Sequence, residues 1–102
     1  MRRAKKRDAN EPAIVAAFEA RGCTVTRIDA KGVPDLLVGW RGANLLVEVK
    51  MPLGPRGGMH TGGNHVRGDL TADQVAWFDA WRGDAVHIVR TVEDVAELLE
   101  LP

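Results

Sequence analysis

The chain has 102 residues, of which 45% are hydrophobic and 27% are charged, and its 14 basic and 14 acidic side chains cancel. This length and composition predict one globular domain with a single modest core, and they exclude a chain that is disordered throughout. The one cysteine, Cys23, excludes an internal disulfide and a zinc site built from several cysteines. No signal peptide and no apolar run long enough to span a membrane is present, so we expect a cytoplasmic protein, in a bacterium or in a phage-infected host cell.

The charge is distributed unevenly along the chain. Residues 1–7 hold five of the 14 basic groups and no acid, so the other 95 residues carry 9 basic and 14 acidic groups, a net charge of −5. A basic arm, residues 1–9, ahead of a mildly acidic domain, residues 10–102, suggests contact with phosphates of DNA. A solvated terminus without a partner explains the pattern equally well. The candidate DNA contacts in the arm are Arg2, Arg3, Lys5, Lys6 and Arg7.

The first element expected is a helix within DANEPAIVAAFEARG, residues 8–22. Asn10 or Asp8 can cap its start, Pro12 is tolerated in the first turn, and Gly22 ends it. Apolar side chains recur through the segment at helical spacing, so one face of this helix should be buried.

Three strands should follow the helix. The segment CTVTRID, residues 23–29, alternates and is rich in β-branched side chains, and we expect the thiol of Cys23 to be half-buried in the core. The nearly apolar runs PDLLVGW, residues 34–40, and NLLVEVK, residues 44–50, flank the short sequence RGA, which predicts a β-hairpin.

Residues 51–69 are rich in glycine, which predicts a long flexible loop without regular structure. Arg56 and Arg67 make this loop a candidate for a flap that contacts DNA, although a mobile surface loop is the simpler interpretation. A second metal site at His60 and His65 is the least favoured reading of the loop, since neither side chain has a fixed geometry.

Two helices and a strand complete the prediction. Thr71 and Gln74 match a capping box, so a helix should begin there and stop at Gly83. The run AVHIVR, residues 85–90, predicts a strand, and VEDVAELLEL, residues 92–101, predicts a terminal helix. The expected fold is therefore α/β, with the order α-β-β-β-α-β-α and a central mixed sheet of about four strands flanked by helices.

Two carboxylates and a lysine interrupt the apolar hairpin. Glu48 and Lys50 are two residues apart and share one face of the sheet. If the hairpin loop contains an even number of residues, two or four, the pairing sets Asp35 opposite Lys50 and Leu37 opposite Glu48. The three polar groups then converge on one face, whereas an odd loop would send Asp35 to the other face unless a bulge corrected it.

Two carboxylates a few ångströms apart repel each other unless a cation lies between them. A small number of hard oxygen ligands suits Mg²⁺ or Mn²⁺, with water and substrate phosphate completing the coordination. A neighbouring lysine could orient a nucleophilic water or stabilise charge on an attacked phosphate, so the group suits phosphodiester hydrolysis. Spacing alone favours the alternative, a structural salt bridge from Lys50 to Asp35 or Glu48.

The motif GVPD…VEVK resembles the PD-(D/E)XK nuclease superfamily, in which Asp35 and the run Glu48-Val49-Lys50 would fill the motif. More closely, the chain from about residue 10 to residue 99 resembles the VRR-NUC group, the virus-type replication-repair nucleases. The matching features come in the group's order: Glu11 opening the first helix, GVPDLLV, LVEVK after the hairpin, and the glutamine helix LTADQVAWFDAWRG.

The resemblance implies a restriction-endonuclease-like fold and a Mg²⁺-dependent (or Mn²⁺-dependent) endonuclease. Asp35, Glu48 and the backbone carbonyl of Val49 would ligate the metal, and Glu11 would reach it directly or through water. The other implied catalytic residues are Lys50, as the catalytic lysine, and Gln74, lining the site.

The position of Gln74 on its helix supports this role independently. It lies in line with Trp77, Phe78 and Trp81, at i+3, i+4 and i+7. A polar amide on an otherwise apolar face needs a partner, which an active site would provide. The alternative is that Gln74 serves the capping box alone. The two tryptophans are expected to be core or dimer contacts.

We expect a homodimer that acts on branched or structured DNA, because single-domain members of the group resemble Holliday-junction resolvases and pairing supplies two active sites. Replication, repair or recombination would be its setting. The main alternative is a catalytically inactive module with the same fold that binds DNA or a partner protein. Cleavage of RNA is a third, weaker possibility.

Overall fold

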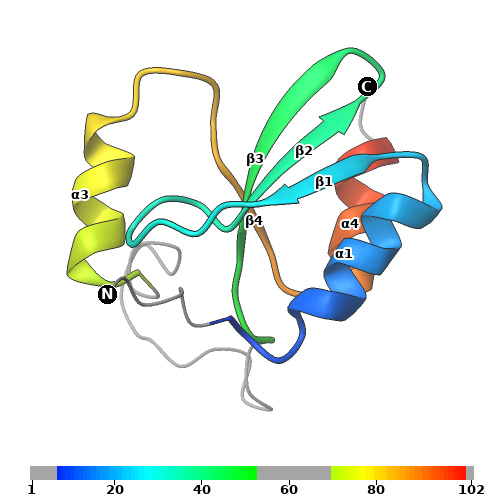
Figure 1. The fold of residues 1–102 in the computed structure, drawn as a ribbon, viewed down its shortest axis with the longest axis horizontal. Coiled ribbons are helices and arrows are strands. Elements are labelled where there is room, and N and C mark those ends of the chain that lie inside the picture. Colours follow the sequence, from blue (N-terminus) through cyan, green and yellow to red (C-terminus); the bar gives the residue numbers. More distant parts are fainter. Residues whose placement is uncertain (1–6, 53–69, 101–102) are drawn as a thin grey trace.

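The computed structural model describes residues 7–52 and 70–100 (Figure 1). These residues form a small α/β domain with a four-stranded mixed sheet and three helices, in the predicted order α-β-β-β-α-β-α. No helix among them is long and apolar enough to cross a membrane. The elements are α1 (Glu11–Ala20), β1 (Thr24–Arg27), β2 (Leu36–Trp40), β3 (Ala43–Val49), α3 (Ala72–Ala80), β4 (His87–Val89) and α4 (Val92–Glu100).

The strands lie side by side in the order β1-β2-β3-β4. The pairs β1–β2 and β2–β3 are antiparallel, whereas β3 and β4 run parallel. A parallel pair cannot be joined by a tight turn, and the connection from β3 to β4 passes through α3. This crossover carries the glutamine helix past the end of β3, where the charged residues of the hairpin lie.

The turn between β2 and β3 consists of Arg41 and Gly42, with Trp40 paired to Ala43. Both turn residues have positive φ angles, 48° and 83°, which a type I′ turn requires and which match the twist of the two strands. The loop therefore has an even number of residues, which is the condition under which Asp35 and Glu48 share a face.

The predicted register of this hairpin is wrong by two residues. Leu37 pairs with Leu46 instead of Glu48, because the turn Arg41–Gly42 is centred one residue before the two loops expected, Gly42–Ala43 or Arg41–Asn44. Continued by one residue beyond β2, the observed pairing sets Asp35 opposite Glu48 instead of Lys50. A shift of two preserves the face on which each side chain lies, so the two carboxylates remain on the same face.

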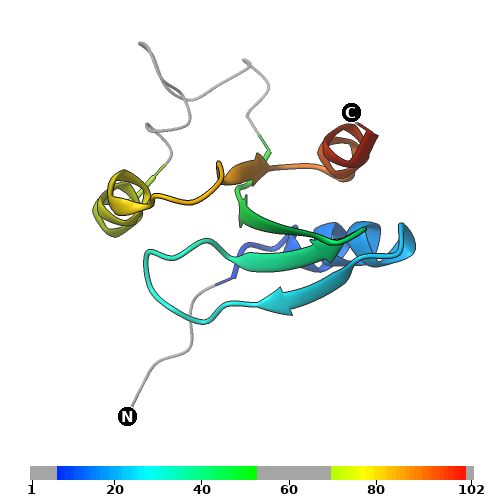
Figure 2. The same ribbon diagram turned by 90° about the horizontal axis from the view of Figure 1, so that it is seen from above.

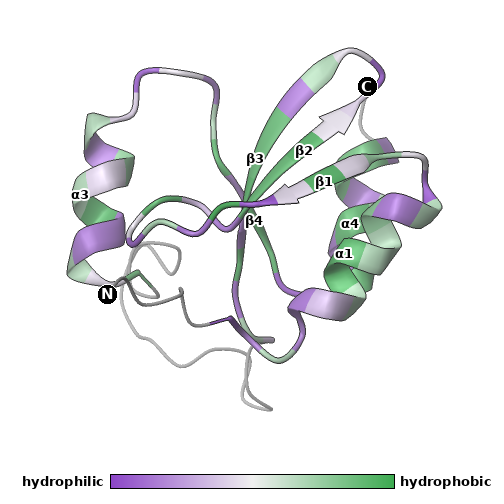
Figure 3. Cartoon of the chain, in the orientation of Figure 1, coloured by the Kyte–Doolittle hydropathy of each residue, from purple (hydrophilic) through white to green (hydrophobic). Residues whose placement is uncertain are grey.

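One face of the sheet packs against α1 and α4, which lie together on the same side in Figures 1 and 2. Strands β2 and β3 and helix α1 are largely apolar, as Figure 3 shows. Cys23 is 7% exposed and belongs to this core, so it is more deeply buried than predicted, and burial raises the pKa of its thiol. The buried core residues are Ile14, Val15, Phe18, Cys23, Leu36, Val38, Val47, Val49, Val89, Val95 and Leu99.

Helix α3 lies on the opposite side of the sheet from α1 and α4 (Figures 1 and 2). Its one buried residue is the polar Gln74. The loop before β2 fits closely beneath its first turn, because a Cβ atom on Gly32 would lie 2.9 Å from the carbonyl oxygen of Asp73. Gly32 also has a φ of +83°, so the glycine of the GVPD motif lets this loop and α3 approach each other.

A candidate active site at the end of the central strands

The buried polar side chains among the described residues are the ones that the sequence assigns to a site. Glu11, Asp35, Glu48 and Gln74 are 1%, 6%, 1% and 8% exposed, respectively. Burying a carboxylate is costly unless charge partners or hydrogen bonds compensate it. Three such groups in one small domain therefore require a network of cations and donors around them.

Glu48, Lys50 and Gln74 form the centre of this network. The amide nitrogen Nε2 of Gln74 donates to Oε2 of Glu48 at 2.7 Å. The ammonium of Lys50 donates to Oε1 of Gln74 at 2.9 Å and lies 3.5 Å from Oε2 of Glu48. The Lys50 side chain is 15% exposed, so a charged group is held at the protein surface in a fixed position.

Gln74 also closes the capping box of α3. Its Oε1 accepts from the backbone N–H of Thr71 at 2.9 Å, while the Thr71 hydroxyl accepts from the N–H of Gln74. The two roles considered for Gln74 are therefore both present, since one amide oxygen serves the helix cap and Lys50 together. The capping box fixes the rotamer that carries the amide to Glu48.

Asp35 lies just before β2 and binds the backbone of β3. Its Oδ2 accepts from the N–H of Val49 at 2.8 Å. The N–H and C=O of a residue in a strand point toward the same neighbouring strand, so the carbonyl of Val49 also points toward Asp35. Asp35, Glu48 and this carbonyl are thus oxygen groups around the end of one strand.

Glu11 is linked to Asp35 through an arginine. The guanidinium NH1 of Arg7 lies 3.4 Å from Oε1 of Glu11 and 3.7 Å from Oδ1 of Asp35. Nε of Arg27 lies 3.0 Å from Oε2 of Glu11. Glu11 therefore stands at the start of α1 as predicted, but its oxygens contact two arginines.

Arg7 occupies a position that the sequence does not indicate. It lies in a run of basic residues and is one of the predicted DNA contacts. In the structure, however, its guanidinium points inward and donates to the carbonyls of Ile28 and Asp35 at 2.9 and 3.3 Å. A single arginine in a basic run has no local signal that separates it from its neighbours. The other predicted DNA contacts, Arg2, Arg3, Lys5, Lys6, Arg56 and Arg67, lie outside the described residues, as do His60, His65 and the loop from residue 53 to 69.

Asn10 is a second contributor that the sequence did not reveal. It occupies the N-cap position of α1, but its side chain makes no capping hydrogen bond. Instead, Nδ2 donates to the backbone carbonyls of Lys50 and Arg90 at 2.9 and 2.8 Å. The side chain thereby joins the ends of β3 and β4 to the start of α1 and fixes the backbone that carries Lys50.

The described residues contain no group of three His, Cys, Asp or Glu side chains arranged to hold a metal ion. The oxygen atoms that could do so are the carboxylates of Asp35 and Glu48 and the Val49 carbonyl. This donor set is hard and small, which fits Mg²⁺ or Mn²⁺ with several ligands left to water or substrate.

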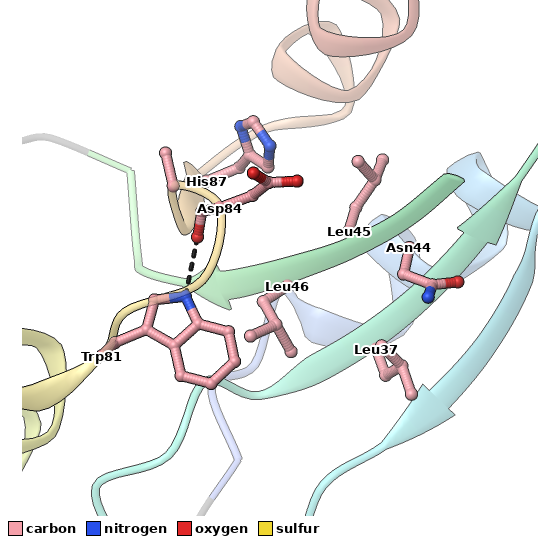
Figure 4. A pocket seen from close by; sticks show the side chains of 8 residues that line it. Leu37, Asn44, Leu45, Leu46, Trp81, Asp84 and His87 are labelled. Carbon is pink, nitrogen blue, oxygen red and sulfur yellow. Dashed lines mark hydrogen bonds between the residues drawn. The ribbon is translucent and has the colours of Figure 1, made fainter.

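A separate apolar surface lies beside the site. Trp81 is 40% exposed, stacks on Trp77 with ring centroids 4.9 Å apart, and donates its indole N–H to the carbonyl of Asp84. Leu37 is 42% exposed and pairs with Leu46 across the hairpin. Trp81, Leu37 and Leu46, labelled in Figure 4, help to line an open hollow of about 630 Å³.

No family model, curated protein or solved structure matches the chain. The interpretation of the site therefore depends on its own residues and geometry.

Proposed function

We propose that this protein is a metal-dependent DNA endonuclease with the PD-(D/E)XK fold, of the VRR-NUC type. The observation that carries the proposal is the meeting of Asp35, Glu48, Lys50 and Gln74 at the end of β3. They come from three separate parts of the chain and include two carboxylates that are almost fully buried. A buried ion pair is weak evidence for a role in stability, so the burial of Asp35 before β2 and of Glu48 on β3 supports a further role.

Asp35, Glu48 and the carbonyl of Val49 would hold Mg²⁺ or Mn²⁺. A metal bound there supplies a hydroxide nucleophile at neutral pH and charge to stabilise the phosphate as it is attacked. Glu11 would act through water, because its own oxygens are occupied by Arg7 and Arg27.

Lys50 would contact the substrate. Its ammonium is held by Gln74 and Glu48 near the edge of the site, where it can orient the attacking water or bind a phosphate oxygen as negative charge develops. In the reaction, the water oxygen bonds to phosphorus and one ester P–O bond breaks. The products are a phosphomonoester and a free hydroxyl group.

The proposed substrate is branched or structured DNA, and the proposed assembly is a homodimer. Exposed apolar side chains around the hollow beside α3, among them Leu37 and Trp81, favour a second copy over solvent. A dimer would place two active sites on one DNA molecule, as resolution of a junction requires.

Cleavage of labelled DNA tests the activity. We expect the protein with Mg²⁺ or Mn²⁺ to cut a junction or flap in preference to linear duplex, and Lys50→Ala to lower the rate about a hundredfold or more. Lys31→Ala is the matched control, because Lys31 is 89% exposed and pairs only with surface Asp73 among the described residues. Equal cutting by wild type and Lys50→Ala would show that the site is wrongly assigned. An RNA substrate in the same panel tests the remaining alternative.

One observation favours a second candidate, an inactive module that binds DNA or a partner protein. Glu11, Asp35 and Glu48 each have a cationic partner among the described residues, so the cluster can be stable without a metal. Tight binding of junction DNA with no cleavage in any divalent metal would support this candidate over the nuclease.

A further inference from the structure

Within the described residues, the cluster holds as many cationic as anionic side chains. Three carboxylates and three cations of residues 7–52 contact one another there, and in their usual charge states these six side chains sum to zero. The ion pairs are Arg7–Glu11 at 3.4 Å, Arg7–Asp35 at 3.7 Å, Arg27–Glu11 at 3.0 Å and Lys50–Glu48 at 3.5 Å. A divalent cation added to this cluster would leave it with an excess of positive charge.

Arg7 differs from the other two cations because it contacts two carboxylates. Its NH1 lies between Glu11 and Asp35, and its NH2 is anchored on the carbonyl of Ile28 at 2.9 Å. The side chain is 24% exposed, compared with 49% for Arg27, so its charge is less screened by water. Of the three cations named above, Arg7 is therefore the one coupled directly to the charge on Asp35.

Arg7 would lie close to a metal bound to either oxygen of Asp35. Oδ2 accepts the N–H of Val49, and Oδ1 is the oxygen that faces Arg7. A magnesium or manganese ion binds a carboxylate oxygen at about 2 Å. With the guanidinium 3.7 Å from Oδ1, two cations would lie within a few ångströms of each other, and their repulsion opposes joint occupancy.

We propose that Arg7 is an internal competitor of the metal. Its guanidinium neutralises Asp35 and Glu11 in the metal-free protein and releases Asp35 when a divalent cation binds. The proposal rests on the metal-dependent function above and adds a condition to it, because the Arg7 side chain must leave Asp35 before the metal can bind fully.

Binding of Mn²⁺ alone, without DNA, tests this competition by isothermal titration calorimetry. We expect Arg7→Gln to bind Mn²⁺ about fivefold more tightly than wild type, the gain that corresponds to losing a partly exposed ion pair. Arg21→Gln is the matched control. It removes the same charge from a pair with Glu100 whose side chains are 43% and 70% exposed, and its affinity should equal that of wild type.

A second substitution locates the effect. Asp35→Asn introduced into Arg7→Gln should remove the gain in affinity, because Asp35 is the shared ligand. A gain in Mn²⁺ affinity that persists without the Asp35 carboxylate would overturn the proposal. Equal Mn²⁺ affinity of Arg7→Gln and Arg21→Gln, or no Mn²⁺ binding by either, would overturn it too. If Arg7→Gln does not fold, Arg7→Lys keeps the charge but loses the fixed guanidinium geometry, and a smaller gain in affinity is expected.

The stability of each variant provides an independent readout. Arg7→Gln should be less stable than wild type in urea without metal and should gain more stability from Mn²⁺, because a tighter ligand shifts unfolding further. If Arg7 served packing alone, Arg7→Gln would be less stable than wild type but would not gain more stability from Mn²⁺. The cleavage assay distinguishes failure of the competition from failure of the proposed nuclease function. If wild type cuts DNA but Arg7→Gln gains no Mn²⁺ affinity, only the competition is refuted. If Arg7→Gln gains Mn²⁺ affinity but no variant cuts DNA, only the nuclease function is refuted.

Discussion

Helices α3 and α4 each span nine residues, yet different forces hold them against the sheet. Helix α4 buries Val95 and Leu99 in the core beside α1, whereas α3 buries Gln74 and leaves Trp77 and Phe78 half-buried. Apolar burial is tolerant of small shifts, but hydrogen bonds are directional. The contrast indicates that α4 supports the fold, while α3 is oriented by the polar groups of the candidate site.

The largest change in stability should come from a substitution in the apolar core that α1 and α4 share. Phe18→Ala in α1 removes a side chain that is 0% exposed, so we expect a loss of about 4 kcal/mol in the free energy of unfolding. Urea denaturation followed by circular dichroism measures it. Glu19→Ala, at an exposed position in the same helix, should change stability by less than about 0.5 kcal/mol. A comparably small loss for Phe18→Ala would show that α1 and α4 do not form the main core.

Loss of the hydrogen bonds that Gln74 makes should have an intermediate effect on stability, confined to α3. Gln74→Ala removes the bonds to Glu48, Lys50 and Thr71, and we expect a loss of about 2 kcal/mol. Amide hydrogen exchange should accelerate in α3 while α4 keeps its protection. Equal acceleration in both helices would contradict separate anchoring.

A second substitution at Gln74 separates its two roles. Gln74→Glu keeps an acceptor for the Thr71 N–H, so the capping box survives, but it replaces the donor 2.7 Å from Glu48 with a carboxylate. We expect the helix cap to persist while the contact with Glu48 is lost. The rate of the proposed DNA cleavage should therefore fall by a larger fraction than the helix content.

Local patterns predicted the elements and much of the site. The Thr71–Gln74 capping box and the start of α1 at Glu11 depend on neighbouring residues and are confirmed, and the hairpin loop meets the condition of even length. The face shared by Asp35 and Glu48 followed from strand alternation and the even loop. These features need no knowledge of the tertiary fold.

The features that sequence reasoning missed depend on contacts between distant parts of the chain. Arg7 contacts Asp35 and Ile28, and Asn10 contacts the carbonyls of Lys50 and Arg90, which no local pattern encodes. The register error arose because the observed two-residue turn, Arg41–Gly42, was not among the loops expected. This turn requires a positive φ at Arg41, an uncommon conformation for a side chain of that size.

A substitution in the apolar hollow beside α3 should have the smallest effect on the stability of the monomer. Leu37→Lys at a position that is 42% exposed should change the stability of the monomer by less than about 0.5 kcal/mol but weaken a dimer that covers this surface. Light scattering coupled to size-exclusion chromatography measures the assembly. A substitution at Glu93, an exposed position on α4, should leave the mass unchanged. If the wild type is monomeric at all concentrations, the proposed homodimer is wrong.

The parallel pairing of β3 with β4 has a consequence for synthesis of the protein. Every residue assigned to the site precedes residue 75, but β4 and α4 follow it, and the core that holds α1 against the sheet requires both. A nascent chain would therefore carry the complete set of charged side chains before it could bury them. The ribosome would thus have to make about a quarter of the chain after the last site residue before the core could bury the carboxylates. The order of the elements delays burial of the site until β4 and α4 have been made.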